Sequence, residues 1–425
     1  MSQFDVSVGI SPRQSFASWA AFIAALEAEG VGRVWVIDSQ LAMKDVYAGL
    51  VVAALNTKWL DLGTGVTNAV TRHPTITANA IAALAEISHG RAVLGLGAGD
   101  SALYGLGLKP QKVAEVEEAV DFFRAVLSGE EGHFGGRRYR LPHLAATVPV
   151  YLAVSQERMC ALAGRKADGA IVMGPAQPDM VRRQVGWIEA GLEEAGRTRS
   201  DFDISFMATT AANVDDVRSW ASTQARLLTH YKELPESLLP FRDEIKLSAE
   251  SYDYTEHLST RAGHSAAASD DLTRALAVVG TSIECSARLR EIWSTGVDTL
   301  MFPLAGRNRV ERFPVEDLGF RGALDVDHRR RTGHGERFLE GPDRQFAVDR
   351  HREVGGQFKP VSLHGGKSFE GEGDRVHAWP EIRQAISARR VGDGRARLLD
   401  EDRACGLNGD ARQHRTRRVF HDSRK

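Results

Sequence analysis

Residues 60–97 read LDLGTGVTNAVTRHPTITANAIAALAEISHGRAVLGLG and contain one complete strand–helix–strand unit. The continuous apolar runs Leu60–Val66 and Ala92–Gly97 predict strands that are covered on both faces. Between them, Pro74 stands where the first helical position should be. The buried face of that helix recurs at helical spacing in Ile76, Ala80, Ile81, Leu84 and Ile87. This order of elements predicts a parallel sheet with helices packed on it.

The same unit repeats along residues 1–313. The other predicted strands are Asp5–Ile10, Arg33–Asp38, Val148–Val154, Gly169–Met173, Asp203–Met207 and Asp298–Phe302. The other predicted helices run near 16–26, 45–55, 113–127, 157–167, 179–195, 215–228 and 282–294. Eight such units predict an α/β fold, a (β/α)8 TIM barrel. A doubly wound open sheet is the alternative, although it usually needs fewer strands.

Two segments do not fit the repeat. Residues 230–270 are too long for a simple turn, and we expect a mostly helical insertion before the last strand, a candidate lid. Residues 314–425 hold seven of the fourteen histidines, and their sparse apolar residues show no helical or strand period. We therefore expect a mostly disordered tail, rich in Arg, Gly and His.

Three interpretations of this tail compete: frame-shifted sequence, a genuine solvated tail, and a basic arm. Scattered acidic residues, from Asp325 to Asp343, dilute the positive charge and weaken the third interpretation. The barrel needs one more helix after its eighth strand, and Arg307–Phe313 begins one. Pro314 and the residues after it do not continue that helix, which supports the frame-shift interpretation.

The composition excludes several classes of protein. The 425 residues carry a formal net charge of −2, which gives no reason to expect a nucleic-acid partner. No apolar run is long enough to span a membrane, and the first residues lack the features of a secretory signal. Cys160, Cys285 and Cys405 are far apart, which excludes a disulfide framework and a CxxC motif. We therefore expect a cytoplasmic protein.

In a barrel of this kind, chemistry lies at the C-terminal ends of the strands. Glycine recurs there in Gly95-x-Gly97-x-Gly99, followed by Asp100 where a dinucleotide fingerprint would need its third glycine. We interpret this motif as a close approach of the backbone to a flat ring, because glycine has no Cβ atom. Ordinary turn chemistry at a strand end is the alternative.

Other polar groups follow neighbouring strands on the same rim. Asp100 either orients a polar ring edge, transfers a proton or caps the next helix, and His73 is either a site residue or a structural histidine. Ser155 and the amides after it open a helix, which favours a phosphate, and the loop that begins at Gly174 adds further amides. No set of metal ligands emerges, since His133 and His143 only flank a basic loop.

Several strings taken together resemble the bacterial-luciferase-like superfamily of flavin and deazaflavin oxidoreductases. They are VWVIDSQ (34–40), DVY (45–47), LGTGVTN (62–68), TRHP (71–74) and ALAEISHGRAVLGLGAGDSA (83–102). PVYLAVS (149–155), ADGAIVMG (167–174) and GVDTLMFPLAGR (296–307) agree less closely. The resemblance runs from about residue 4 to residue 313 and is greatest to the methylenetetrahydromethanopterin-reductase-like branch.

This resemblance implies a homodimeric barrel that binds coenzyme F420 or, as the alternative, FMN. It implies a cis peptide bond between Gly65 and Val66, behind the cofactor ring. Asp100 and His73 are then the expected catalytic residues. The residues that it places at the cofactor ring or its phosphate are Asp38, Gly65, Val66, Thr67, Asn68, Gly97, Ser101, Ser155, Gln156, Gly174, Pro175 and Ala176.

Two positions depart from the family pattern. Gly9 stands where the archaeal reductases carry a glutamate, which argues against tetrahydromethanopterin as the substrate. Ser39 stands where many members carry a histidine, which argues against luciferase and sugar dehydrogenase chemistry. We expect hydride transfer between F420 and a small organic substrate. The alternatives are an FMN-dependent monooxygenase, which uses O2 and reduced flavin from a partner reductase, and a non-catalytic flavin-binding protein.

Overall fold

A computed structural model describes residues 5–10, 12–13, 15–40, 43–253 and 263–304. The predicted tail, 314–425, and the start of the helix predicted after the eighth strand lie outside the described residues. The division of the chain at residue 313 therefore stays a prediction.

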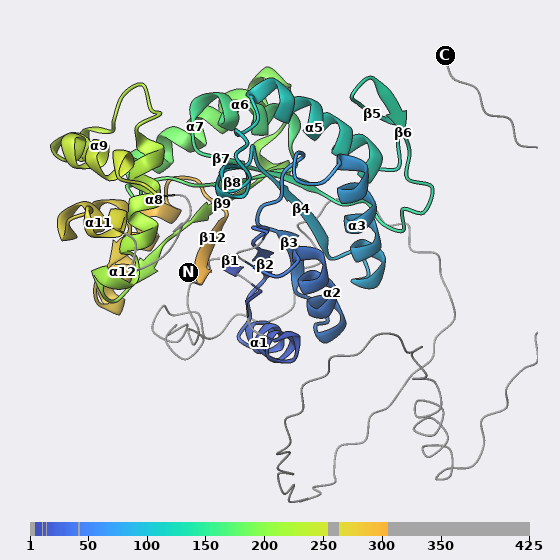
Figure 1. Cartoon of the computed structure of the whole chain (residues 1–425), viewed down its shortest axis with the longest axis horizontal. Coiled ribbons are helices and arrows are strands. Elements are labelled where there is room, and N and C mark those ends of the chain that lie inside the picture. The colour runs from blue at the N-terminus through green and yellow to red at the C-terminus, as the bar shows by residue number, and fades with distance from the viewer. Residues whose placement is uncertain (1–4, 11, 14, 41–42, 254–262, 305–425) are drawn as a thin grey trace, which may run out of the picture. The chain divides into compact units, whose positions relative to one another are not determined.

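Eight parallel strands close into a barrel in the order β1–β12–β9–β8–β7–β4–β3–β2 (Figure 1). The strands are β1 (Asp5–Ile10), β2 (Arg33–Val36), β3 (Asp61–Thr64), β4 (Ala92–Leu96), β7 (Val150–Val154), β8 (Gly169–Val172), β9 (Asp203–Met207) and β12 (Thr299–Leu304). The predicted (β/α)8 barrel is confirmed, and the open-sheet alternative is wrong because β1 pairs with both β2 and β12.

Helices cover the outside of this barrel. They are α1 (Phe16–Ala28), α2 (Val46–Asn56), α3 (Pro74–Ile87), α4 (Ser101–Tyr104), α5 (Val113–Leu127), α6 (Glu157–Lys166), α7 (Pro178–Glu194), α8 (Arg218–Leu228) and α12 (Ser282–Trp293). Side chains fix where several of them begin. The Ser15 hydroxyl accepts from the Ser18 amide at 3.2 Å, and the Asp45 carboxylate accepts from the Ala48 amide at 3.0 Å.

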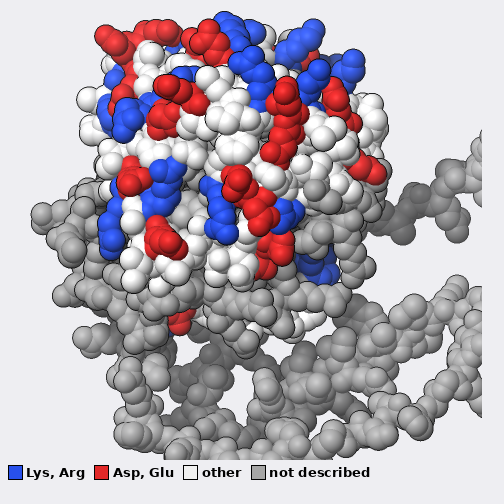
Figure 2. All heavy atoms as spheres, turned by 90° about the vertical axis from the view of Figure 1, so that its left-hand side faces the viewer, with Lys and Arg blue, Asp and Glu red and all other residues white. Residues whose placement is uncertain are grey.

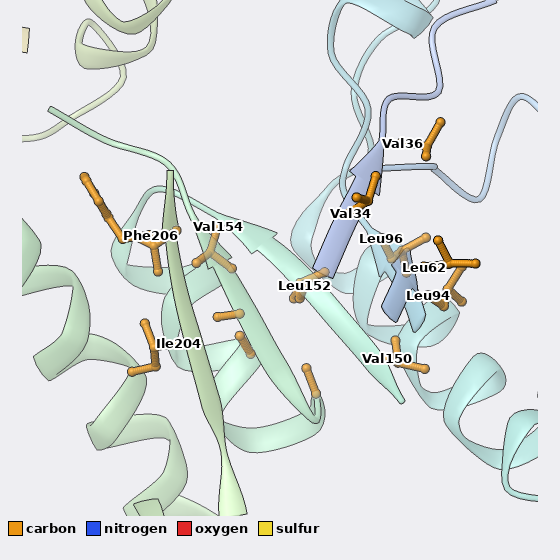
Figure 3. Close-up of a cluster of buried hydrophobic side chains, with 14 of the residues drawn as sticks. Val34, Val36, Leu62, Leu94, Leu96, Val150, Leu152, Val154, Ile204 and Phe206 are labelled. Carbon is orange, nitrogen blue, oxygen red and sulfur yellow. The ribbon is translucent and has the colours of Figure 1, made fainter. Parts of the chain in front are cut away.

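Strand residues alternate between two cores. One set packs outward against the helices and includes Val34, Val36, Leu94, Leu152 and Phe206 (Figure 3). The alternate residues point into the barrel and form a lumen cluster: Trp35, Val93, Tyr151, Ile171, Met207 and Met301, with Trp220 from α8. Gly63 leaves the space that Trp35 needs, because a Cβ there would lie 2.5 Å from the indole ring.

A polar network joins the N-terminal ends of five strands. Asp203 accepts hydrogen bonds from Arg33 (2.9 Å), the Tyr151 hydroxyl (2.9 Å) and the Thr299 hydroxyl (3.2 Å). Arg33 also reaches Asp61 at 3.5 Å. Burial disfavours the charge on Arg33, but Tyr151, Asp203 and Asp61 together raise its pKa. The network ties β2, β3, β7, β9 and β12 together at the end of the barrel opposite the predicted site.

The segment between β9 and β12 forms a small unit of its own. Two short strands pair in parallel, β10 (Thr210–Ala211) and β11 (Val278–Val279). Between them lie α8, a 3-10 helix (Glu236–Phe241), α9 (Arg242–Glu250), α10 (Gly263–Ala266) and α11 (Asp270–Leu276). They share a core that includes Ala225, Leu238 and Leu272. The described part of the predicted insertion is therefore helical, while residues 254–262 lie outside the described residues.

The outer surface near this unit carries charges of both signs. Figure 2 shows the side of the molecule on which α9, α11 and α12 lie, and there basic and acidic side chains are interspersed. Arg218 pairs with Asp215 and Asp270, and Arg288 pairs with Glu291. Within the described part of the chain, no helix combines the length and the apolar character that crossing a bilayer requires.

The basic loop predicted around residues 135–138 is in fact a hairpin. Strands β5 (Gly132–Phe134) and β6 (Arg137–Tyr139) pair antiparallel. Gly135 and Gly136 connect them with φ of 57° and 72°, the conformation that a two-residue hairpin turn requires.

Candidate functional site

The C-terminal ends of the barrel strands, here called the barrel mouth, gather most of the predicted residues. After β3, the peptide bond between Gly65 and Val66 is cis, so this expectation is confirmed. Val66 is half-buried and packs against the lumen cluster. The backbone then bonds to the neighbouring strand, because the Thr67 amide donates to the Gly95 carbonyl at 3.0 Å. The segment after β3 and the end of β4 therefore form one edge of the mouth.

An ion-pair network holds this edge from behind. Asp38, only 6% exposed, accepts from the Thr67 hydroxyl at 2.7 Å and from Arg72 at 2.5 Å. Arg72 also bonds to Asp45 at 2.9 Å and lies over the ring of Tyr47. Burial raises the pKa of Tyr47 to about 12, so its hydroxyl stays protonated. Asp38 was predicted to bind cofactor, whereas the structure uses its carboxylate to position Thr67.

Asn68 and His73 shape the turn between β3 and α3. The Asn68 side-chain carbonyl accepts from the amides of Val70 (2.9 Å) and Thr71 (2.8 Å). His73 is exposed and caps α3, with Nδ1 accepting from the Thr75 amide at 3.3 Å. Its ring lies 5.9 Å from Phe134 in the β5–β6 hairpin, centroid to centroid. These contacts agree with the structural alternative for His73 rather than with catalysis.

Gly97 allows close packing beside this edge. Its amide donates to the Thr67 carbonyl at 2.9 Å, which places β4 beside the segment that follows β3. A Cβ at Gly97 would lie 2.9 Å from Cγ2 of Val66. Gly97 and Val66 are therefore in close contact, and any larger side chain at 97 would displace Val66.

Asp100 is held by a residue that the sequence did not single out. Its carboxylate forms an ion pair with Arg226 of α8 at 2.5 Å, and Arg226 lies over the ring of Tyr252. Asp100 occupies the N-cap position of α4, where Ser101 is the first residue, but its side chain makes no capping hydrogen bond. Capping by the Asp100 side chain is therefore wrong, and the ion pair links the β4–α4 turn to α8.

One half of the predicted phosphate-binding site, the N-terminus of α6, has uncapped amides. Helix α6 begins after Gln156 with no side chain capping it, so the first amides of the helix have no partner within it. The Ser155 carbonyl is fixed from behind by Gln184 at 2.8 Å and by the Tyr231 hydroxyl. Helix N-termini attract anions through these amides and the helix dipole. This half agrees with the prediction for Ser155 and Gln156.

In the second half of this site, Gly174–Ala176, backbone groups are already hydrogen-bonded. The Ala176 amide donates to the Leu276 carbonyl at 3.1 Å, and the Ala176 carbonyl accepts from Arg288 at 3.1 Å. Gly174 and Pro175 are buried, and a Cβ at Gly174 would lie 2.8 Å from the Gln184 amide. The prediction that the Ala176 amide binds phosphate is therefore wrong, because α11 already occupies that donor.

The residues present fit a flat ring that carries a phosphate. Val66 packs closely against Gly97 and offers an apolar surface, and α6 presents uncapped amides after β7, the strand next to β4. In the described ranges, no group of three or more His, Cys, Asp or Glu side chains is arranged to hold a metal ion.

The chain belongs to the luciferase-like monooxygenase family, whose model matches residues 1–299. A 5,10-methylenetetrahydromethanopterin reductase of Methanolobus tindarius is 30% identical over 294 residues, which are 66% of this chain and 88% of that protein. An F420-dependent glucose-6-phosphate dehydrogenase of Nakamurella multipartita is 32% identical over 180 residues, 38% of this chain and 53% of that protein. The predicted family and the predicted enzyme class, an oxidoreductase, are confirmed.

A solved structure shares the fold. The coenzyme F420-dependent tetrahydromethanopterin reductase of Methanopyrus kandleri superposes with a TM-score of 0.59 at 20% sequence identity. The match covers 75% of this chain and 97% of that chain.

The sequence did not indicate the residues that contact the site but lie far from it along the chain. Arg226, Gln184 and Tyr231 hold Asp100 and Ser155, yet each lies between 29 and 126 residues away along the chain. The hairpin alone had a local signal, the Gly135–Gly136 pair.

Proposed function

We propose that this protein transfers a hydride between coenzyme F420 and a small organic substrate bound at the barrel mouth. The packing of Val66 against Gly97 and the lumen cluster carries the proposal, because it gives a ring at the barrel mouth an apolar surface to lie on. The named relatives support F420, since the Nakamurella dehydrogenase and the Methanopyrus reductase are both described as F420-dependent.

The bound cofactor supplies or accepts the hydride, and the protein supplies orientation. Val66 would support one ring face from the β3 side. Asp38 and Arg72 would keep Thr67 in place beside it. The N-terminus of α6, with Ser155 and Gln156, would bind the phosphate. Asp100 remains the proposed polar residue at the ring edge, where its ion pair with Arg226 fixes the position of the carboxylate.

Binding measurements test this function directly. Purified protein is titrated with F420 and with FMN, each followed by its own fluorescence. We expect F420 to bind at least tenfold more tightly than FMN. Tighter FMN binding would favour the oxygen-using alternative, and binding of neither would contradict the site assignment.

We also propose that two copies of the chain form a homodimer through α2 and α3. Neither helix contains a basic residue, and Glu86 is their one acidic residue. Leu55 is 70% exposed and Ile76 is 60% exposed on these neighbouring helices. Exposed apolar side chains on adjacent elements are typical of a protein–protein interface.

Substitution on these helices should separate the copies. We expect L55E/I76E to elute as a monomer in size-exclusion chromatography with light scattering, whereas the wild-type chain elutes as a dimer. Leu247 on α9 is 58% exposed, and L247E serves as the matched control that should stay dimeric. An unchanged mass for L55E/I76E would place the interface elsewhere.

We further propose that the protein is cytoplasmic and that a separate F420 reductase is its electron source. Cys160 and Cys285 are buried free thiols, the state that a reducing compartment maintains. Burial raises the pKa of the Cys160 thiol, so it is not a reactive thiolate.

A further inference from the structure

Trp220 belongs to the lumen cluster and comes from the helix that follows β9 along the chain. Helix α8 follows β9, and β9 lies four positions from β3 in the eight-stranded barrel, directly across the lumen. Trp220 belongs to the lumen cluster with Met207 and Met301, while Val66 packs against the same cluster from the β3 side. A flat ring supported by Val66 therefore has its other face directed toward α8.

The Trp220 indole lacks the partner that a buried N–H normally has. The side chain is only 9% exposed, and its Nε1 makes no hydrogen bond to any described residue. Buried tryptophan N–H groups usually find an acceptor, and leaving one unpaired is destabilising. Gln224, 3% exposed, lies one turn further along the same face of α8. Two polar groups thus lie on the face of α8 that carries Trp220 into the lumen.

Two arginines that the structure describes around the mouth are already paired with opposite charges. Arg226 of α8 forms its ion pair with Asp100, and Arg72 on the β3 side is paired with both Asp38 and Asp45. A charged substrate would have to break such a pair to gain a partner, and an uncharged one would not.

We propose that Trp220 is a specificity-determining residue that donates its indole N–H to the substrate. The substrate is an uncharged, planar molecule with a carbonyl oxygen or imine nitrogen as hydrogen-bond acceptor. This inference rests on the proposed function, since it needs F420 on the Val66 side of the mouth. It adds the chemical class of the molecule on the opposite side.

Nuclear magnetic resonance of the indole protons tests the proposal on the wild-type chain. The chain has seven tryptophans, and the signal that disappears in W220F is that of Trp220. The protein is first saturated with oxidised F420, and cofactor fluorescence measures this binding. Cyclohex-2-en-1-one, an uncharged planar carbonyl compound, is then added; oxidised F420 cannot reduce it. We expect the Trp220 indole proton to move downfield only at this second step.

Variants separate the N–H from the ring. W220F keeps an aromatic ring without a donor, and we expect it to bind the enone about two- to tenfold more weakly while its F420 affinity is unchanged. Trp187 on α7 packs against the outer core rather than the lumen cluster, so W187F is the matched control. It should match wild type in both affinities.

The outcomes distinguish the role of Trp220 from the proposed function. A downfield shift with F420 alone would overturn the assignment to the substrate, because the acceptor would then lie on the cofactor. No shift at either step, with F420 bound, would overturn the role of Trp220 while leaving the proposed function intact. Failure of F420 to bind at all would overturn both.

Discussion

Gly97 shows how strongly one residue constrains the barrel mouth. A Cβ at this position would lie 2.9 Å from Val66, closer than real carbon atoms approach without movement. We expect G97A to weaken F420 binding by about tenfold or more, because Val66 would be pushed toward the ring. Fluorescence titration of the cofactor measures the effect.

Gly186 provides the matched control for this substitution. It lies within α7, and a Cβ there would meet no atom within 4 Å. We expect G186A to leave F420 binding unchanged and to stabilise the chain by about 0.5–1 kcal/mol, since alanine favours helix. Equal F420 affinity in G97A and G186A would show that the surface beside Val66 is not the ring site.

Residues with local signals were predictable, and residues defined by distant contacts were not. Gly65, Val66 and Ser155 lie beside strand ends that the apolar runs located. The Ala176 amide was misassigned because its acceptor, Leu276, is 100 residues further along the chain. Arg226 escaped notice for the same reason, since an arginine on a predicted helix normally faces solvent.

At the scale of the elements, one carboxylate connects α1 to β3. Glu27 accepts from the amides of Lys58 (2.8 Å), Trp59 (2.8 Å) and Leu60 (3.0 Å). We expect E27A to lower the free energy of unfolding by about 1.5–3 kcal/mol, because three amides lose a charged acceptor. Urea denaturation measures it, and E29A, at an exposed position on the same turn, should change little. Equal losses in the two variants would contradict the role of Glu27.

The capping box of α12 makes its stability depend on pH. The Glu284 carboxylate accepts from the amide (2.8 Å) and the hydroxyl (2.9 Å) of Thr281, and both bonds lower the pKa of Glu284. A lowered pKa gives stability that is present above the ordinary value and lost as pH falls through the folded-state value. We expect the wild type to lose its advantage over E284Q below the ordinary value of 4.5. If the urea midpoints of the wild type and E284Q changed in parallel as the pH falls, this role of Glu284 would be contradicted.

The periodic elements were predicted within a few residues, and the shortest ones were missed. Strand β1 and helix α3 have the bounds that the sequence indicated, because each has a clear period and a clear start. Strands β10 and β11 have only two residues each and pair across a long stretch of chain, so no local pattern marks them.

For the whole molecule, closure of the barrel depends on the Asp203 network. Five strands meet at this carboxylate or at its partner Arg33, whose side chain is only 18% exposed. We expect D203A to lower the free energy of unfolding by about 3 kcal/mol. It leaves the largely buried Arg33 with only its longer contact to Asp61. The exposed pair between Glu131 and Arg138 is the control, and E131A should cost less than about 1 kcal/mol. A similar cost for both would mean that the network does not hold the barrel closed.

The adjacent pairing of β10 and β11 has an evolutionary consequence. Residues 212–277 begin and end at two short paired strands outside the barrel, and neighbouring strands lie about 4.8 Å apart in any sheet. A segment whose two ends meet in this way can be replaced by another of different length without moving the strands that it joins. Trp220 and Arg226 belong to this segment, whereas Val66 and Gly97 belong to the barrel. Exchange of this one segment can therefore change the residues that would face the substrate, provided that the contacts of Tyr231 with Ser155 and of Leu276 with Ala176 are kept.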